Sequence, residues 1–313
     1  MLTKFTNIEK AKTFSNKRIE SIREALADID VLESVAVVAV GSIARREASE
    51  HSDLDYFLLG EDGPIPAGQI ACINNAIERA GLKSPAADGA FAAGVSIGRM
   101  VGVIGGDDDS TNLLTKRMLF LLESDWLSGE SVYVNAMDCV LRKYISDEIT
   151  PRQIARFLLN DVIRYYRTIC VDFEYKTGSI GKSWGDRNIK LMFSRRLLYF
   201  SGLLAVAATA QSTPAVKRDR VTVLLRKTPI DRVHEICGDS AYGSLQAYDQ
   251  FLGWLADGDV RQMLRSTTAV RLDHSEKFRE MKNAGHHFAW HLEALLSRVH
   301  PSSHPIHQAL SGC

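Results

Sequence analysis

The chain has little cysteine, little proline and no hydrophobic run long enough to cross a bilayer. Its five cysteines are spread over 313 residues without a CxxC pair, so we expect neither a disulfide scaffold nor a zinc knuckle. The longest nearly apolar stretch, residues 197–210, is shorter than the roughly 20 residues that a bilayer requires. The segment MLTKFTNIEKAKTF lacks the apolar core of a signal peptide. These absences predict a cytoplasmic protein that has no membrane partner.

The chain also has no excess of charge of one sign. It contains 38 Lys and Arg against 38 Asp and Glu, which removes the overall attraction that a non-specific nucleic-acid binder uses. A local basic groove remains compatible with this balance. Hydrophobic residues make up 45% and charged residues 24%, as in ordinary globular proteins. The length favours two domains.

The first part of the chain alternates between helical and strand patterns. Residues 5–29 have helical spacing, whereas residues 34–40 form a short β-branched run that ends at a glycine. A second strand is predicted at 53–59, a helix at 67–80 and a third apolar segment at 91–97. This order predicts a small mixed sheet.

The rest of the chain has a helical period. Because no convincing strand appears after residue 110, we expect an α+β protein with a small mixed-sheet domain at 1–125 and an all-helical domain at 126–313. A linker is expected near 105–109, and the turn-rich end of the chain is expected to be poorly ordered. The predicted helices are 113–123, 132–144, 151–175, 187–208 and 274–299.

The most informative stretch is VAVGSIARREASEHSDLDYFLLG, in which ten residues separate Gly41-Ser42 from Asp53-x-Asp55. A strand that ends in Gly-Ser and runs into a helix presents backbone N–H groups and a hydroxyl, which suit phosphate oxygens. The side-chain period of two places Asp53 and Asp55 on one strand face. Two such carboxylates would bind Mg²⁺, with two ions expected and Mn²⁺ as an alternative, and would hold a nucleoside triphosphate (NTP) for nucleotidyl transfer. An edge strand exposed to solvent and an ordinary helix cap are the alternative interpretations.

With these motifs the sequence resembles the nucleotidyltransferases of the DNA polymerase β superfamily. The resemblance implies a polymerase β-like domain that transfers a nucleoside monophosphate from an NTP to an acceptor and releases pyrophosphate. It also implies a third acidic residue that binds metal and accepts the proton of the acceptor. Asp88 has the expected place in the chain and is assigned to this catalytic role, although Ala-Asp-Gly is also a common turn. The acids at 107–109 are rivals, with Ser110 or Asp109 as the cap of the next helix.

Basic residues in both halves are candidates for nucleotide binding. Arg45 belongs to the Gly-Ser motif and is assigned to the nucleotide together with Gly41 and Ser42. In the helical half, Arg164 lies on one polar helix stripe, and Arg187 and Lys190 follow a glycine-bearing loop. These three would bind phosphates. The alternative is that they are ordinary residues of a solvent-exposed face.

The glycine-bearing loop with Arg187 and Lys190, together with the segment LTKRMLFLLESDWLSGE, resembles the protein-PII uridylyltransferase group and related putative signal-transduction nucleotidyltransferases. The chain shows no His-Asp pair of the HD type and no repeated sensor region, so uridylylation of a PII protein is not carried over. The acceptor is left open among a protein, an RNA such as tRNA, a nucleotide and a small molecule. A non-catalytic nucleotide-sensing module and a toxin of a defence system are the other functions considered. The nucleobase and the oligomeric state are also left open.

Overall fold

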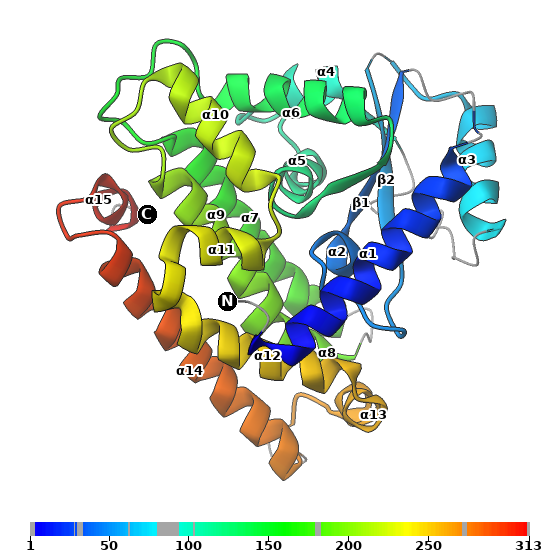
Figure 1. Ribbon diagram of the computed structural model, residues 1–313, viewed down its shortest axis with the longest axis vertical. Helices are drawn as coiled ribbons and strands as arrows, with labels where there is room; N and C mark the ends of the chain where they lie inside the picture. The colour runs from blue at the N-terminus through cyan, green and yellow to red at the C-terminus, as the bar shows by residue number, and fades with distance from the viewer. Residues whose placement is uncertain are drawn as a thin grey trace. The chain divides into compact units, whose positions relative to one another are not determined.

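The computed structural model describes residues 4–27, 29, 34–61, 63–79, 94–102, 104–178, 183–270 and 274–311 (Figure 1). The chain forms two compact units, and each is composed of separated segments. The sheet unit comprises Ala11–Ala155 and Gln211–Thr228, and the helical unit comprises Met1–Lys10, Arg156–Ala210 and Pro229–Cys313. These units differ from the expected division at residue 125, because two segments that were assigned to the second domain pack with the sheet.

The sheet unit is built on four strands in the order β3-β2-β1-β4. The central strand β1 (Val35–Val40) pairs antiparallel with β2 (Asp55–Gly60) and with β4 (Asp125–Ser128), and β2 pairs parallel with β3 (Val95–Ser96). Every residue of β1 is buried, which explains its continuous apolar run. The expected α+β class with a small mixed sheet is confirmed. β4 was missed because its four residues show no alternation and directly follow a helix.

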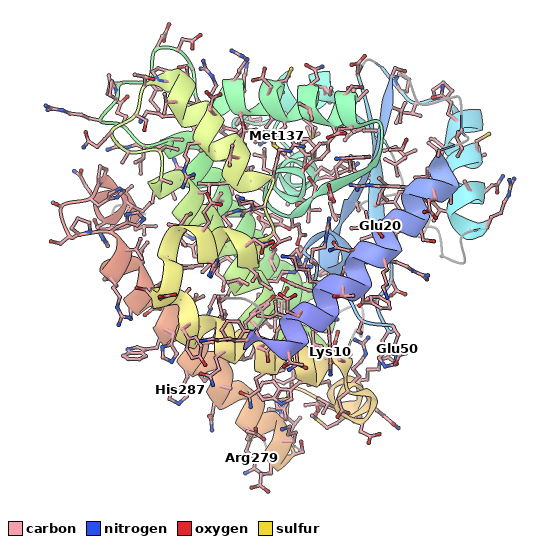
Figure 2. All side chains as sticks on the ribbon, viewed as in Figure 1. Lys10, Glu20, Glu50, Met137, Arg279 and His287 are labelled. Atoms are coloured by element: carbon pink, nitrogen blue, oxygen red, sulfur yellow. The ribbon has the colours of Figure 1, made fainter. Side chains whose placement is uncertain are left out.

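Helices cover both faces of the sheet. On one face, α1 (Thr6–Leu26) and α3 (Ala67–Arg79) contribute apolar side chains to a core shared with alternate residues of β1 and β2. The opposite face packs against α5 (Thr111–Glu123) and α6 (Glu130–Tyr144). Figure 2 labels Met137, which α6 buries, and Glu20, which lies on the exposed side of α1. Amphipathic helices on both faces therefore account for the buried central strand.

Three shorter helices complete the sheet unit. A single turn, α2 (Gly41–Ala44), follows β1, and α4 (Ile97–Gly102) follows β3. Helix α10 (Pro214–Leu225) comes from much later in the chain and packs against α5 and α6. The predicted helix after the linker begins where expected, because the Ser110 side chain accepts a hydrogen bond from the Leu113 N–H (3.2 Å).

The helical unit is centred on stacked aromatic rings. Phe193 stacks on Phe251 (4.8 Å between ring centroids) and on Phe288 (5.2 Å). The end of the chain was expected to be poorly ordered, but its residues 305–311 form a helix. Of the helices in the described ranges, none is both long and apolar enough to cross a membrane. The elements are α7 (Arg156–Gly178), α8 (Trp184–Lys190), the π-helical segment η2 (Leu191–Arg195), α9 (Arg196–Ala207), α11 (Pro229–Cys237), the 3₁₀ turn η3 (Gly238–Ala241), α12 (Tyr242–Ala256), α13 (Gly258–Ser266), α14 (Glu276–Val299) and α15 (Pro305–Ser311).

Candidate active site

The candidate site lies where β1 ends and β2 begins. Val40, the last residue of β1, pairs with Asp55, the first residue of β2, and the short helix α2 follows β1 directly (Figure 1). Gly41 has a φ of +73°, and a Cβ built on it would lie 2.7 Å from Asp55 Oδ2. Both the left-handed backbone and this close approach require glycine. The tertiary structure thus brings together the two halves of the motif.

The segment after Gly41 is much shorter than the expected helix. It makes one turn, in which the Arg45 N–H donates to the Gly41 carbonyl (3.0 Å) and the Glu47 N–H donates to the Ser42 carbonyl (2.8 Å). A single turn has little macrodipole, so the attraction of a long helix for anions is not available here. The backbone N–H groups at the start of the turn and the half-buried Ser42 hydroxyl remain the groups suited to phosphate.

A strained arginine ends this turn. Arg46 has a φ of +62°, a conformation that costs a non-glycine residue about 1–2 kcal/mol. Its guanidinium donates to Asn16 Oδ1 (2.7 Å) and to the Ala44 carbonyl (2.9 Å), and it forms an ion pair with Asp125 (2.6 Å). These contacts offset the strain and hold the backbone that follows Gly41 and Ser42 in one conformation.

Arg45 lies in a buried cluster of charges. Its side chain pairs with Glu47 (2.8 Å) and with Glu123 at the end of α5, and all three residues are buried. Opposite charges that are buried together must be paired, because a single buried charge is costly. The structure therefore gives Arg45 a role in anchoring the turn to α5. Its expected contact with a nucleotide stays a prediction.

Asp53 and Asp55 are both exposed, whereas Leu54 between them is 4% exposed. The alternation expected of the Asp-x-Asp motif is therefore present. The strand begins only at Asp55, so Asp53 lies in the preceding loop rather than on the strand. This start is two residues later than expected, because the ladder with β1 ends at the pair Val40 and Asp55.

The carboxylates of Asp53 and Asp55 and the hydroxyl of Ser42 are of the chemical type that binds a hard divalent cation, since Mg²⁺ prefers oxygen ligands. The sequence predicts a third carboxylate, for which Asp88 and the acids at 107–109 are the candidates. Asp88 lies outside the described residues, and within those ranges no group of three or more His, Cys, Asp or Glu is arranged to hold a metal. Among the rivals, Asp109 is buried and bridges Arg117 (2.9 Å), which gives it a structural role.

Asp125 is an acid near this edge that the sequence did not single out. It pairs with Ala39 of β1, one residue before the partner of Asp55. Directly opposed residues project from the same face of a sheet, so Asp125 shares the face of Ala39, and Asp55 lies on the other face. Asp125 also pairs with Arg23 (3.4 Å). We therefore do not assign it to the group that contains Asp55.

The basic residues of the helical half belong to the other compact unit. Arg164 pairs with Asp161 (3.7 Å), and the half-buried Lys190 pairs with Asp186 (2.9 Å) on α8. Arg187 on the same helix is half-buried. Their contacts with phosphate remain predictions, as does their membership in one site with Gly41, Ser42, Asp53 and Asp55.

Part of the glycine-bearing loop has a structural explanation. A Cβ on Gly185 would lie 2.5 Å from the Leu264 carbonyl, and the Gly185 N–H donates to the Thr267 carbonyl (3.2 Å). This glycine therefore permits close packing of α8 on α13. Residues 179–182, which include Gly181 and Lys182 of the expected glycine-bearing loop, lie outside the described residues.

Comparison with known proteins assigns no family. No family model matches the chain, and no curated protein matches it.

Proposed function

We propose that the sheet unit is a Mg²⁺-dependent nucleotidyltransferase domain of the DNA polymerase β type. It transfers a nucleoside monophosphate from an NTP to an acceptor hydroxyl and releases pyrophosphate. The observation that carries this proposal is the closeness of the Asp55 carboxylate to Gly41, on which an added Cβ would lie 2.7 Å from Asp55 Oδ2. It supports the proposal because a phosphate held at Gly41 and Ser42 would lie next to the acidic groups that neutralise it through a metal.

The residues of this site have separable tasks in the proposed reaction. The N–H groups at Gly41 and Ser42, together with the Ser42 hydroxyl, donate hydrogen bonds to phosphate oxygens. Asp53 and Asp55 would hold Mg²⁺, which supplies charge neutralisation at the α-phosphate. The acceptor oxygen forms a bond to the α-phosphorus, the bond from that phosphorus to the bridging oxygen of the β-phosphate breaks, and pyrophosphate leaves. The acceptor proton passes to a base, for which Asp88 is the assigned residue.

A non-catalytic nucleotide-binding module is the second candidate function. It is favoured by the absence of a third suitably placed carboxylate in the ranges that the structure describes. Such a module would bind an NTP at Gly41 and Ser42 without turnover. The exposed pair Asp53 and Asp55 favours catalysis over this alternative, since a pure sensor has no need of two neighbouring carboxylates beside a phosphate.

The experiment incubates the purified chain with each α-³²P-labelled NTP, Mg²⁺ and a cell lysate, and follows transfer of label to macromolecules and small molecules. Transfer should require Mg²⁺ and be abolished by Asp53→Asn and by Asp55→Asn while thermal unfolding is unchanged. Glu50→Gln is the matched control, because Glu50 is an exposed acid of the same loop (Figure 2). Undiminished transfer by both Asn variants at saturating Mg²⁺ would eliminate the site. NTP binding without transfer would favour the sensing module.

A further inference from the structure

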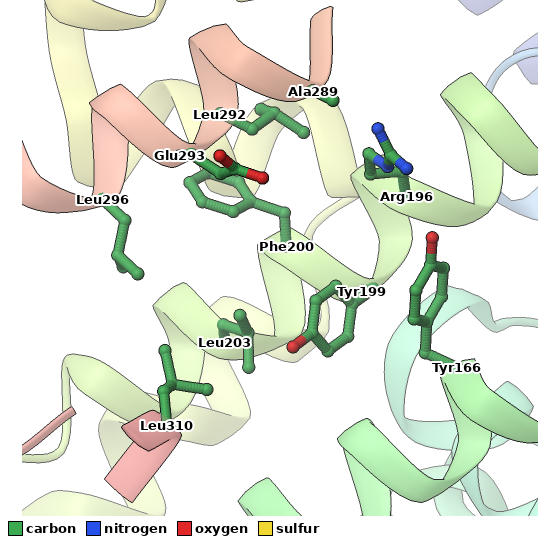
Figure 3. Close-up of a pocket in the computed structure, with 10 residues that line it drawn as sticks. All are labelled: Tyr166, Arg196, Tyr199, Phe200, Leu203, Ala289, Leu292, Glu293, Leu296 and Leu310. Atoms are coloured by element: carbon green, nitrogen blue, oxygen red, sulfur yellow. The ribbon is translucent and has the colours of Figure 1, made fainter. Parts of the chain in front are cut away.

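The helical unit contains a pocket of about 300 Å³ that is separate from the candidate active site (Figure 3). Four helices of this one unit line it, namely α7, α9, α14 and α15. Its volume is at the lower end of the roughly 300–1,000 Å³ range of small-molecule sites. The pocket is therefore large enough for a small metabolite.

The interior of the pocket is apolar. Phe200 and Leu203 from α9 and Leu292 from α14 are at most 5% exposed and form its buried wall. Leu296 and Leu310 add aliphatic surface from α14 and α15. This lining favours an apolar group of the ligand, because removing such a group from water is worth about 25 cal/mol per Å².

Two aromatic rings form another part of the wall. Tyr166 of α7 and Tyr199 of α9 are stacked, with 4.6 Å between ring centroids and 18° between the ring planes. Stacked rings present a rigid, flat surface, which loses little conformational entropy when a ligand binds. In Figure 3 the hydroxyl of Tyr166 is directed toward the side of the pocket where Arg196 lies.

Two opposite charges border this apolar space on different helices. Arg196 comes from α9 and Glu293 from α14. Arg196 is half-buried and Glu293 is exposed, and in the part of the chain that the structure describes no ion pair joins them to one another or to another residue. Figure 3 shows their charged groups toward one side of the pocket, whereas Leu203 and Leu310 lie toward the other. Arg196 directly follows the π-helical segment η2, and such segments are frequent at functional sites.

We infer that this pocket binds a free α-amino acid with a large apolar side chain. The α-carboxylate pairs with Arg196, the α-ammonium pairs with Glu293, and the side chain enters the apolar interior beside the two tyrosines. An acid without the ammonium group would lack the ion pair with Glu293, and an amine without the carboxylate would lack the ion pair with Arg196. A purely apolar ligand would use neither charge. The inference does not depend on the proposed nucleotidyl transfer.

Calorimetry on the full chain tests this inference with L-phenylalanine and L-leucine as probes. Two analogues dissect the charges: 3-phenylpropanoate lacks the ammonium group of L-phenylalanine, and 2-phenylethylamine lacks its carboxylate. At least one amino acid should bind, and if it is L-phenylalanine both analogues should bind roughly tenfold or more weakly. Failure of both amino acids to bind would overturn the inference. If either analogue bound as tightly as L-phenylalanine, the assignment of the ligand as an α-amino acid would be overturned.

Substitutions locate the binding at this pocket. Arg196→Gln and Glu293→Gln should each weaken amino-acid binding roughly tenfold or more, and Ala289→Phe should block it by filling the space beside α14. Arg298→Gln is the matched control, because Arg298 is exposed on α14 outside the pocket lining. Thermal unfolding confirms that each variant is folded. The location would be overturned if none of the three pocket substitutions weakened amino-acid binding. It would also be overturned if Arg298→Gln weakened binding as much as they do.

Discussion

Glycine is required at position 41 for two reasons, the positive φ and the nearby Asp55 carboxylate. Comparison with a second glycine that has only the positive φ separates the two. Gly41→Ala places a Cβ against Asp55 Oδ2 and strains a φ of +73°. Gly63 has a similar φ of +66°, but a Cβ there would contact nothing within 4 Å. Both alanine variants should lose about 1–2 kcal/mol of unfolding free energy from backbone strain. We expect Gly41→Ala alone to lower NTP turnover strongly, because it displaces the Asp55 carboxylate.

The measurement for the two glycines pairs urea unfolding with the label-transfer assay. Equal turnover in Gly41→Ala and Gly63→Ala would show that the close approach of Asp55 to Gly41 has no catalytic consequence. Loss of stability without loss of turnover at Gly41 would have the same meaning.

His300, at the end of α14, makes the stability of the helical unit depend on pH. Burial, together with nearby His304 and His307, lowers the pKa of His300 from 6.5 to about 4. Its Nε2 is buried without a hydrogen-bond partner among the described residues, and its ring lies 4.3 Å from that of His304. Above the unfolded pKa of 6.5 both states are neutral here. As the pH falls from 6.5 toward 4, only the unfolded chain binds this proton, so stability decreases.

The test compares the free energy of unfolding across this pH range for the parent chain and for His300→Phe. The parent should lose stability progressively as the pH falls below 6.5, and the variant should lose less, because it lacks the titrating ring. Parallel pH profiles of the two proteins would contradict the assignment to His300.

At the scale of elements, α8 depends on a glycine for its packing. Gly185→Ala should destabilise the chain by about 1–3 kcal/mol, as is typical of overpacking, because the new Cβ would lie 2.5 Å from the Leu264 carbonyl of α13 and 2.7 Å from Thr267 Cβ. Gly258→Ala is the control, since a Cβ there would contact nothing within 4 Å. Thermal unfolding measures both. A Gly185→Ala chain as stable as the control would show that α8 shifts without cost.

Elements with a strong local pattern were predictable. The helices at 111–123 and 276–299 and the strands at 35–40 and 55–60 lie within a few residues of their expected bounds, because hydrophobic periodicity over such lengths decides their type. β4 and η2 were not predictable. A four-residue strand depends on its pairing with β1, and a π-helical segment depends on packing, as the aromatic stack around Phe193 illustrates.

At the scale of the whole molecule, α10 packs in the sheet unit although it lies far along the chain from the rest of that unit. The stability of the sheet unit therefore depends on contacts between distant segments. Lys217 of α10 is completely buried, and its Nζ donates to the carbonyls of Pro151 (3.0 Å) and Gln153 (2.7 Å). Lys217→Met should lower the unfolding free energy by about 1–3 kcal/mol, because it removes two hydrogen bonds that a charged group donates. Arg226→Gln removes the exposed pair with Glu130 (3.4 Å) and should cost less than about 1 kcal/mol.

Denaturant unfolding of both variants distinguishes the buried contact from the exposed one. Equal losses in Lys217→Met and Arg226→Gln would mean that α10 adds little to the sheet unit through Lys217. A loss confined to Lys217→Met would establish this link between the segment 211–228 and the rest of the unit.

The sequence by itself determined the α+β class, the apolar strand β1 and the exposed pair Asp53 and Asp55, because each depends on the hydrophobic pattern of neighbouring residues. It also placed Gly41 and Ser42 at the end of that strand. Only the tertiary structure decided that Arg45 pairs with Glu123, 78 residues away, that α10 packs in the sheet unit, and that four helices line an apolar pocket. Contacts between distant segments are selected by how the whole chain buries its apolar surface and pairs its buried charges, and no local pattern encodes that choice.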